Sequence, residues 1–285
     1  MITRILNGKC IYNNMIFNIG DKVEKYFNTY NITPCLSIFL IGNNFSSNLY
    51  VKNKIFSCKS VYIKYILFKF SKTVRIKTLI LLLNILNKDC HINGILIQKP
   101  LPQRLNKLIL FKSISFSKDV DLMNPLKISN YMSGFDVGIS PCVSQAVFCF
   151  LNKLNLNLCG LKVVIFGFSN IVGKPLCYEF VSRGSTVSII NEHDNNFKNL
   201  SQYADIFIIA IGSPLFLSKG MISYGSVIID IGINKIANNK VVGDADISDL
   251  LGKVSWITPV PGGIGPVTIS YLLLNTLTLF LHQQI

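Results

Sequence analysis

The sequence predicts an α/β protein with two α/β domains, the second built on a Rossmann-like parallel sheet. Short apolar segments alternate with longer amphipathic stretches along the 285 residues, the pattern of strands joined by helices. Segments such as Lys162–Phe166 are apolar at nearly every position, as expected of parallel strands buried on both faces. Half of the residues are hydrophobic, so two cores can be filled and intrinsic disorder is excluded.

The alternation places the individual elements. The first half contains predicted strands at Cys35–Ile41, Val61–Phe68 and Gly94–Gln98, with helices at about Ser47–Ser60 and Val74–Asn87. The second half contains predicted strands at Lys162–Phe166, Thr186–Ile190, Ile206–Ala210 and Val227–Asp230, with helices that begin near Ile171 and Leu200. A last helix, Ile269–His282, follows a Gly/Pro cluster at 259–266 and is free to pack on either half.

The distribution of charged residues changes at about residue 133, next to a Gly/Pro/Ser-rich passage. The net charge is +14, and the whole excess lies in residues 1–133, while residues 134–285 are neutral. A basic half can serve an acidic partner such as nucleic acid. Only four of the 28 cations are Arg, the residue that phosphate-binding surfaces favour, so compositional drift explains most of the lysines better. A Gly/Pro/Ser-rich passage at 133–141 indicates a domain boundary near 120–140.

Several classes of protein are excluded by pattern. No apolar run reaches the roughly 18–20 residues that cross a bilayer, because the longest one is interrupted by Asn275, Thr276 and Thr278. The first nine residues lack the apolar core of a signal peptide. Eight cysteines and three histidines show no metal-ligand spacing, so we expect reduced thiols, no metal site and a cytoplasmic protein without a membrane partner.

A glycine turn in the second half predicts a dinucleotide site. The strand Lys162–Phe166 runs directly into Gly167, and Gly173 follows at the start of a helix, so backbone N–H groups there can face a pyrophosphate. The spacing is G-x-S-x-x-x-G, weak as a bare motif, but further glycine turns follow the next strands. The residues assigned to the cofactor are Gly167, Phe168, Ser169, Ile171, Val172, Gly173, Glu192, Gly212 and Ile233.

A second set of polar residues lies in the first half. Tyr50 and Lys54 are four apart, on one face of a predicted helix, and Gln98 ends an apolar strand. Asp119 and Asp121 follow in a polar turn. Taken alone, an exposed Tyr/Lys pair is most often a solvated helix face and an Asp-rich turn is most often only a turn.

Taken together, these blocks resemble the bifunctional methylenetetrahydrofolate dehydrogenase/methenyltetrahydrofolate cyclohydrolase family. The resemblance covers nearly the whole chain and rests on four blocks in order. They are Tyr50-Val51-Lys52-Asn53-Lys54; Asn93–Pro102 with Lys118-Asp119-Val120-Asp121; Gly167–Pro175; and Thr258-Pro259-Val260-Pro261-Gly262-Gly263-Ile264-Gly265-Pro266-Val267-Thr268. Asp230–Asn234 with Val241-Val242-Gly243-Asp244 also matches.

The resemblance implies oxidation of 5,10-methylenetetrahydrofolate with NADP, then hydrolysis of the methenyl product to 10-formyltetrahydrofolate. It implies a folate domain at 1–133 plus the terminal helix 267–285, an NAD(P) domain at 134–266, a cleft between them and a homodimer. The C-terminal helix then returns to the first domain. The residues it implicates are Lys54, Tyr50, Gln98 and Asp121 in catalysis, and Tyr50, Asp121, Pro261, Gly262 and Gly263 in folate binding.

The chemistry of these side chains suits the implied roles. Lys54 can assist water addition only if burial and neighbouring cations lower its pKa. Gln98 can orient Lys54, and the Asp121 carboxylate suits the donor edge of an aminopyrimidine ring. Tyr50 offers a face on which a flat ring can stack.

The chain also departs from the family pattern. Leu122-Met123-Asn124 replaces Gly-Phe-His after Asp121, Val143-Ser144 replaces Thr-Pro, and Lys99 replaces a common leucine. Phe168 stands where many members have Arg, and Glu192 disfavours a 2′-phosphate, so NAD remains an alternative to NADP.

Two alternative functions stay open at this stage. Leu122 and Val143-Ser144 allow a dehydrogenase with weakened or lost cyclohydrolase activity. The basic first half allows a nucleic-acid-binding protein, although no aromatic-basic binding motif is present and we expect no nucleic-acid partner.

Overall fold

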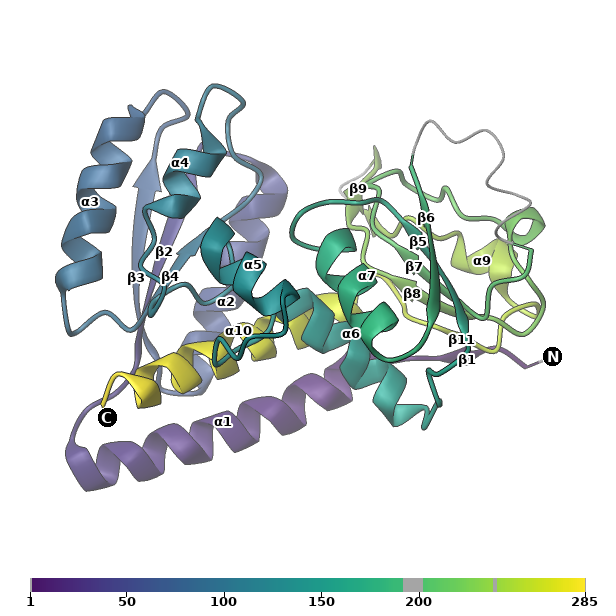
Figure 1. The fold of residues 1–285 in the computed structure, drawn as a ribbon, viewed down its shortest axis with the longest axis horizontal. Helices are drawn as coiled ribbons and strands as arrows, with labels where there is room; N and C mark the ends of the chain where they lie inside the picture. The colour runs from purple at the N-terminus through teal and green to yellow at the C-terminus, as the bar shows by residue number, and fades with distance from the viewer. Residues whose placement is uncertain (1, 192–201, 238–239, 285) are drawn as a thin grey trace. The chain divides into compact units, whose positions relative to one another are not determined.

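The computed structural model describes residues 2–191, 202–237 and 240–284, and the chain divides into two compact units (Figure 1). The three-stranded unit comprises Asn13–Cys142 and the chain from Ile269 onward. The six-stranded unit comprises the chain up to Tyr12 and Val143–Thr268. These boundaries differ by some residues from the expected domains at 1–133 with 267–285 and at 134–266, which remain a prediction about function.

A parallel sheet of three strands forms the centre of the three-stranded unit. Its order is β3 (Lys64–Phe70), β2 (Cys35–Ile41), β4 (Gly94–Ile97). Ile38 of β2 lies opposite Leu67 on one side and Leu96 on the other. All seven residues of β2 are buried, which explains why its sequence is continuously apolar. The crossovers are α2 (Phe45–Ser60) and α3 (Ile76–Lys88), as predicted.

The start of β3 differs from the prediction. The apolar run from Val61 predicts a strand, but Val61 ends α2 by donating its N–H to Cys58 O, and Tyr62 adopts a left-handed φ of 58°. The strand therefore begins at Lys64.

Two long helices lie side by side in this unit (Figure 1). They are α1 (Gly8–Tyr30), which the sequence analysis did not predict, and α10 (Ile264–His282), which begins earlier than the predicted Ile269. Tyr26 of α1 packs edge-on against Phe280 of α10, with ring centroids 5.0 Å apart. The predicted return of the C-terminal helix to the first domain is therefore confirmed.

The apolar composition of α10 follows from its burial. Among the described helices it alone is long and apolar enough, by length and composition, to cross a membrane. Yet 61% of its most apolar window is buried inside the protein, as in the core helix of a soluble protein.

The six-stranded unit contains the predicted Rossmann-like sheet. Its strands are all parallel, in the order β1 (Arg4–Ile5), β11 (Trp256–Ile257), β8 (Val227–Asp230), β7 (Ile206–Ile209), β5 (Lys162–Phe166), β6 (Thr186–Ile190). The two-residue strands β1 and β11 were not predicted, and the helix predicted near Leu200 lies outside the described residues.

The described residues also form several shorter elements. They are α4 (Lys107–Lys112), α5 (Pro125–Met132), α6 (Cys142–Lys153), α7 (Gly173–Ser182), a 3₁₀ turn (Lys219–Met221), the hairpin of β9 (Asn234–Lys235) with β10 (Val241–Val242), and α9 (Ile247–Leu250).

The turn from β5 into α7 requires glycine at two positions. Gly167 has a φ of +97°, and a Cβ there would lie 2.6 Å from Ala210 O. A Cβ at Gly173 would lie 2.2 Å from Gly167 O and 2.8 Å from the Cα of Phe168. The helix can therefore start this close to the strand end only without side chains at these two positions.

We expect Gly173→Ala to lower the free energy of unfolding by about 1–3 kcal/mol, because the added methyl group displaces the turn. The matched control is Gly220→Ala, since a Cβ at Gly220 meets nothing within 4 Å. That control is expected to stay within about 0.5 kcal/mol of the parent in urea denaturation. Equal destabilisation by both substitutions would contradict the packing argument.

Candidate active site

Helix α2 presents the first two predicted site residues. Asn44 caps it by accepting the Ser47 N–H at 3.0 Å, and the Ser47 hydroxyl donates to Lys99 O at 3.1 Å. The start of the helix is thereby joined to the chain that leaves β4. Tyr50 and Lys54 follow one and two turns later on the same face.

Gln98 makes direct contact with Lys54. The Lys54 Nζ donates to Gln98 Oε1 at 2.8 Å, and the Gln98 Nε2 donates to Lys99 O at 2.7 Å. Because its amide nitrogen is used on the backbone, Gln98 presents its oxygen to the lysine. Lys54 Nζ also lies 6.0 Å from the centroid of the Tyr50 ring. The structure thus brings together three of the four residues predicted to be catalytic.

Burial dominates the ionisation of this group. It lowers the pKa of Lys54 below its usual value, against the opposing influence of the Asp121 carboxylate. It raises the pKa of Tyr50 to about 12. Burial therefore shifts Lys54 toward its neutral amine, the form that can accept a proton, next to a phenol that stays neutral.

The fourth predicted residue, Asp121, donates its backbone N–H to the carboxylate of Asp119, at 3.4 Å. Buried Asp119 accepts N–H groups from Met123 at 3.0 Å and Asn124 at 2.7 Å. Its backbone carbonyl accepts from Lys127 Nζ at 3.0 Å. Asp119 therefore has a structural role, and Asp121 is the carboxylate that acts most strongly on the Lys54 ammonium.

The C-terminal helix contributes a residue that the sequence analysis missed. The Asn275 Nδ2 lies within hydrogen-bond distance of Val120 O (3.0 Å), Ser140 O (2.9 Å) and Cys142 Sγ (3.4 Å). The Cys142 N–H in turn donates to Asp121 Oδ1 at 3.3 Å. The available signal was a polar Asn in an otherwise apolar helix, which the sequence analysis used only to exclude a membrane span.

The family departures next to Asp121 are explained in part. Leu122 adopts a left-handed φ of 50°, which favours glycine, and its side chain is buried in the core of the three-stranded unit. The larger residue therefore adds to the core at the cost of backbone strain. Ser144 Oγ is buried and has no hydrogen-bond partner among the described residues.

The predicted cofactor turn is exposed on the six-stranded unit. The Ser169 hydroxyl accepts the Val172 N–H at 3.2 Å, and the Ser169 carbonyl accepts the Lys174 N–H at 3.0 Å. Among the described residues, the N–H groups of Ile171 and Gly173 donate to no protein acceptor, so they are available to an anion. Phe168 is 42% exposed.

Of the other predicted cofactor residues, Glu192 lies outside the described residues. Gly212 is held by a buried carboxylate, because Asp244 Oδ2 accepts the N–H groups of Ile211 at 2.8 Å and Gly212 at 2.9 Å. Ile233, which follows β8, is partly buried.

Asp230 at the end of β8 forms a second such anchor. It accepts N–H groups from Gly232, Asp244 and Ala245, and burial raises its pKa to about 7. Sequence reasoning included Asp230 and Asp244 only as part of a matching block and did not assign their anchoring roles.

The predicted folate residues Pro261, Gly262 and Gly263 belong to the six-stranded unit and precede α10. The Gly262 carbonyl accepts the Gly8 N–H at 2.8 Å, so the start of α1 holds this turn.

Comparison with known proteins now identifies the family. The tetrahydrofolate dehydrogenase/cyclohydrolase catalytic domain matches residues 6–121, and the NAD(P)-binding domain of the same enzymes matches residues 141–284. The chain belongs to the tetrahydrofolate dehydrogenase/cyclohydrolase family. The resemblance drawn from the sequence is therefore confirmed, and the predicted dinucleotide turn lies in the NAD(P)-binding domain of the family.

Individual family members are similar over their whole length. The bifunctional protein FolD of Rickettsia peacockii is 38% identical over 98% of this chain and 97% of its own. A crystal structure of the bifunctional FolD enzyme of Campylobacter jejuni is 34% identical, with a TM-score of 0.93 over 98% of this chain and 99% of that one. The Trypanosoma brucei FolD structure, complexed with NADP and an inhibitor, is 26% identical, with a TM-score of 0.95 over 99% and 98% of the two chains.

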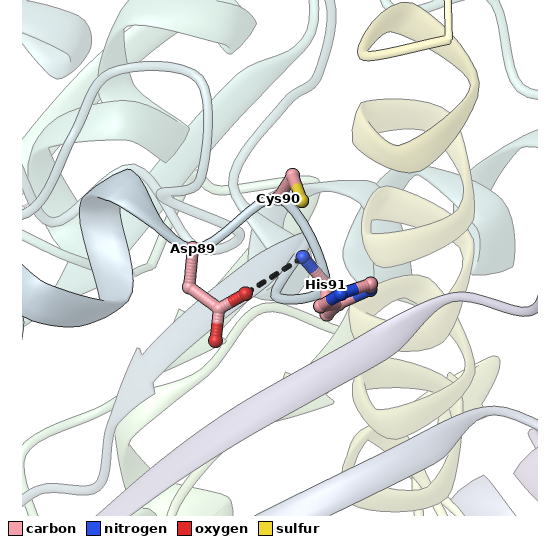
Figure 2. A group of neighbouring side chains, drawn as sticks. All are labelled: Asp89, Cys90 and His91. Carbon is pink, nitrogen blue, oxygen red and sulfur yellow. Dashed lines mark hydrogen bonds between the residues drawn. The ribbon is translucent and has the colours of Figure 1, made fainter.

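Another cluster of polar side chains lies at the turn before β4. Asp89, Cys90 and His91 place a carboxylate oxygen, a thiol and an imidazole nitrogen within 4.8 Å of one another (Figure 2). The Asp89 Oδ1 already accepts the His91 N–H at 2.9 Å, and the Lys118 ammonium donates to Asp89 O at 2.6 Å. The turn and the adjacent cation explain this cluster without a bound ion.

Alkylation under native conditions tests the burial of the site thiol. Burial raises the pKa of Cys142 well above its usual value, so iodoacetamide at pH 7.5 is expected to leave it unmodified. Peptide mass spectrometry should show faster modification at the exposed thiols of Cys10, Cys90 and Cys159 than at the buried thiols of Cys35, Cys58 and Cys142. Cys142 reacting as fast as Cys10 would contradict the described packing.

Proposed function

We propose that this chain oxidises 5,10-methylenetetrahydrofolate with NADP and hydrolyses the 5,10-methenyl product to 10-formyltetrahydrofolate, using Lys54 as the base. Family membership supports the two activities. The observation that carries the assignment is the 2.8 Å hydrogen bond between Lys54 and Gln98, next to Tyr50. We also propose a cytoplasmic homodimer, on the family resemblance.

The dehydrogenase step needs the cofactor to be held rather than activated. NADP, when bound, accepts the hydride that leaves the bridging methylene carbon. The turn from Gly167 to Gly173 fits a phosphate group, since the Ile171 and Gly173 N–H groups have no protein acceptor among the described residues. Ser169 keeps this turn closed through its hydrogen bonds to Val172 and Lys174.

The hydrolysis step uses the neutral amine. A water oxygen bonds to the methenyl carbon while Lys54 Nζ accepts one of the water protons. Gln98 Oε1 holds the amine in place for this transfer. The C–N bond to the pterin nitrogen then breaks as the proton on Lys54 passes to that nitrogen and the hydroxyl proton of the adduct is released to solvent. This leaves a neutral formyl group on the other nitrogen, one proton released per turnover, and the free base.

Tyr50 and Asp121 bind the pterin in this proposal. The raised pKa of Tyr50 keeps its phenol neutral, so the ring can stack on the pterin without adding charge. The Asp121 carboxylate suits the paired N–H donors of an aminopyrimidinone. Its backbone N–H donates to Asp119 and its Oδ1 accepts the Cys142 N–H, so both neighbours fix its position.

A dehydrogenase with weakened cyclohydrolase activity is the second candidate. It is favoured by the changed residues at Leu122 and at Val143-Ser144. Against it, the Leu122 side chain is buried in the core, and the Lys54–Gln98 pair is intact.

Lys54→Ala tests the base directly. Supplied with methenyltetrahydrofolate, the variant is expected to lose about 10²–10⁴-fold of the hydrolysis rate, because no other amine contacts Gln98 among the described residues. Lys52→Ala is the matched control, since this lysine lies on the same helix but is exposed. A parent enzyme that accumulates the methenyl compound would favour the second candidate.

Cofactor choice is tested by initial rates with NADP and NAD at equal concentration. We expect NADP to be preferred by less than about tenfold, because Phe168 stands where a cation would bind the 2′-phosphate. Phe168→Arg is expected to raise that preference by about tenfold, and Phe168→Leu to leave it unchanged. A parent preference for NAD would overturn the assignment of NADP.

A further inference from the structure

One half-buried lysine of the three-stranded unit, Lys99, has no hydrogen-bond acceptor for its ammonium among the described residues. Burial lowers the pKa of four lysines in this unit: Lys54, Lys99, Lys118 and Lys127. Three of them donate to oxygen atoms, on Gln98 for Lys54, on Leu86 and Asp89 for Lys118, and on Phe116 and Asp119 for Lys127. Among the described residues, the Lys99 ammonium contacts only the Phe111 ring, 4.8 Å from its centroid.

Lys99 is also fixed in position and lies at the site. Its carbonyl oxygen accepts from Ser47 Oγ at 3.1 Å and from Gln98 Nε2 at 2.7 Å, so the backbone cannot swing outward. Asp121 is the charged group that acts most strongly on its ammonium, followed by Asp119 and by Lys107. No ion pair within 4.0 Å joins Lys99 to either carboxylate in the part of the chain that the structure describes.

The Lys99 ammonium is partly shielded from water and keeps N–H groups that no protein acceptor takes, so a ligand bound next to Gln98 and Asp121 can supply the acceptor. The proposed ligand has one in the required place. A pterin presents two N–H donors on the edge that suits Asp121, and its ring carbonyl oxygen is next to them on the same ring. A carboxylate and an ammonium near one another therefore match the two halves of that edge.

We propose that Lys99 is a substrate-binding residue whose ammonium donates a hydrogen bond to the pterin carbonyl oxygen, next to the N–H donors bound by Asp121. The inference rests on the proposed function and adds a contact that a leucine at this position cannot make. It also gives folate binding a pH dependence. Burial sets the pKa of Lys99 at about 8, so binding weakens as the ammonium loses its proton above that pH.

The test is the dissociation constant of tetrahydrofolate, measured by calorimetry at pH 7.0 and 9.5. Lys99→Leu is expected to weaken binding about tenfold at pH 7.0 and to change little between the two pH values. Lys99→Arg should bind within about threefold of the parent at pH 7.0 and stay tight at pH 9.5, because a guanidinium does not titrate there. The parent should lose affinity over the same interval.

The matched control is Lys112→Leu, which removes one positive charge from an exposed position at the end of α4. It should bind as the parent does at both pH values. The proposal is overturned if Lys99→Leu binds within twofold of the parent at pH 7.0, or if its affinity falls with pH in parallel with the parent. Failure of the proposed function is separate, because the parent itself would then not bind tetrahydrofolate.

Discussion

The carbonyl oxygen of Lys99 accepts one hydrogen bond from Ser47 at the start of α2 and another from the side chain of Gln98 at the end of β4. The first bond ties the start of α2 to the chain that leaves β4, and so it fixes the position of Lys54 relative to that strand end. The second turns the Gln98 oxygen toward Lys54, at 2.8 Å. Lys54 lies on α2 and Gln98 follows β4. Displacing the Lys99 carbonyl oxygen would therefore move the Lys54 amine away from the Gln98 oxygen.

The strands were largely predictable because their apolar runs are continuous, which in β2, β5 and β8 follows from burial on both faces. The predicted bounds of β2, β5, β6 and β8 agree with the structure. β3 begins late because the left-handed residue Tyr62 shortens an equally apolar run. The strands β1 and β11 are two residues each, which is too short to show a periodicity in the sequence. They form only because they pair with strands that are distant along the chain.

The sequence blocks identified the residues of the site, but the contacts between their side chains are visible only in the structure. Lys54 and Gln98 are 44 residues apart, and nothing in either segment states which atom of the amide faces the amine. Asn275 is an ordinary polar residue until its three neighbours from two other segments are seen together. What distinguishes Lys99 is that its ammonium has no hydrogen-bond acceptor among the described residues. That depends on the residues packed around it and cannot be read from its own segment.

Neither compact unit is a continuous stretch of chain, because the sequence passes from one to the other at 12/13, at 142/143 and at 268/269. The first residues supply an edge strand to one sheet, and the last residues supply α10 to the other unit. A ribosome that has released only the first 142 residues has therefore made a sheet that still lacks its covering helix. For the same reason, a single cut in the gene cannot yield two self-sufficient halves, which constrains how such a two-activity enzyme could ever be divided in evolution.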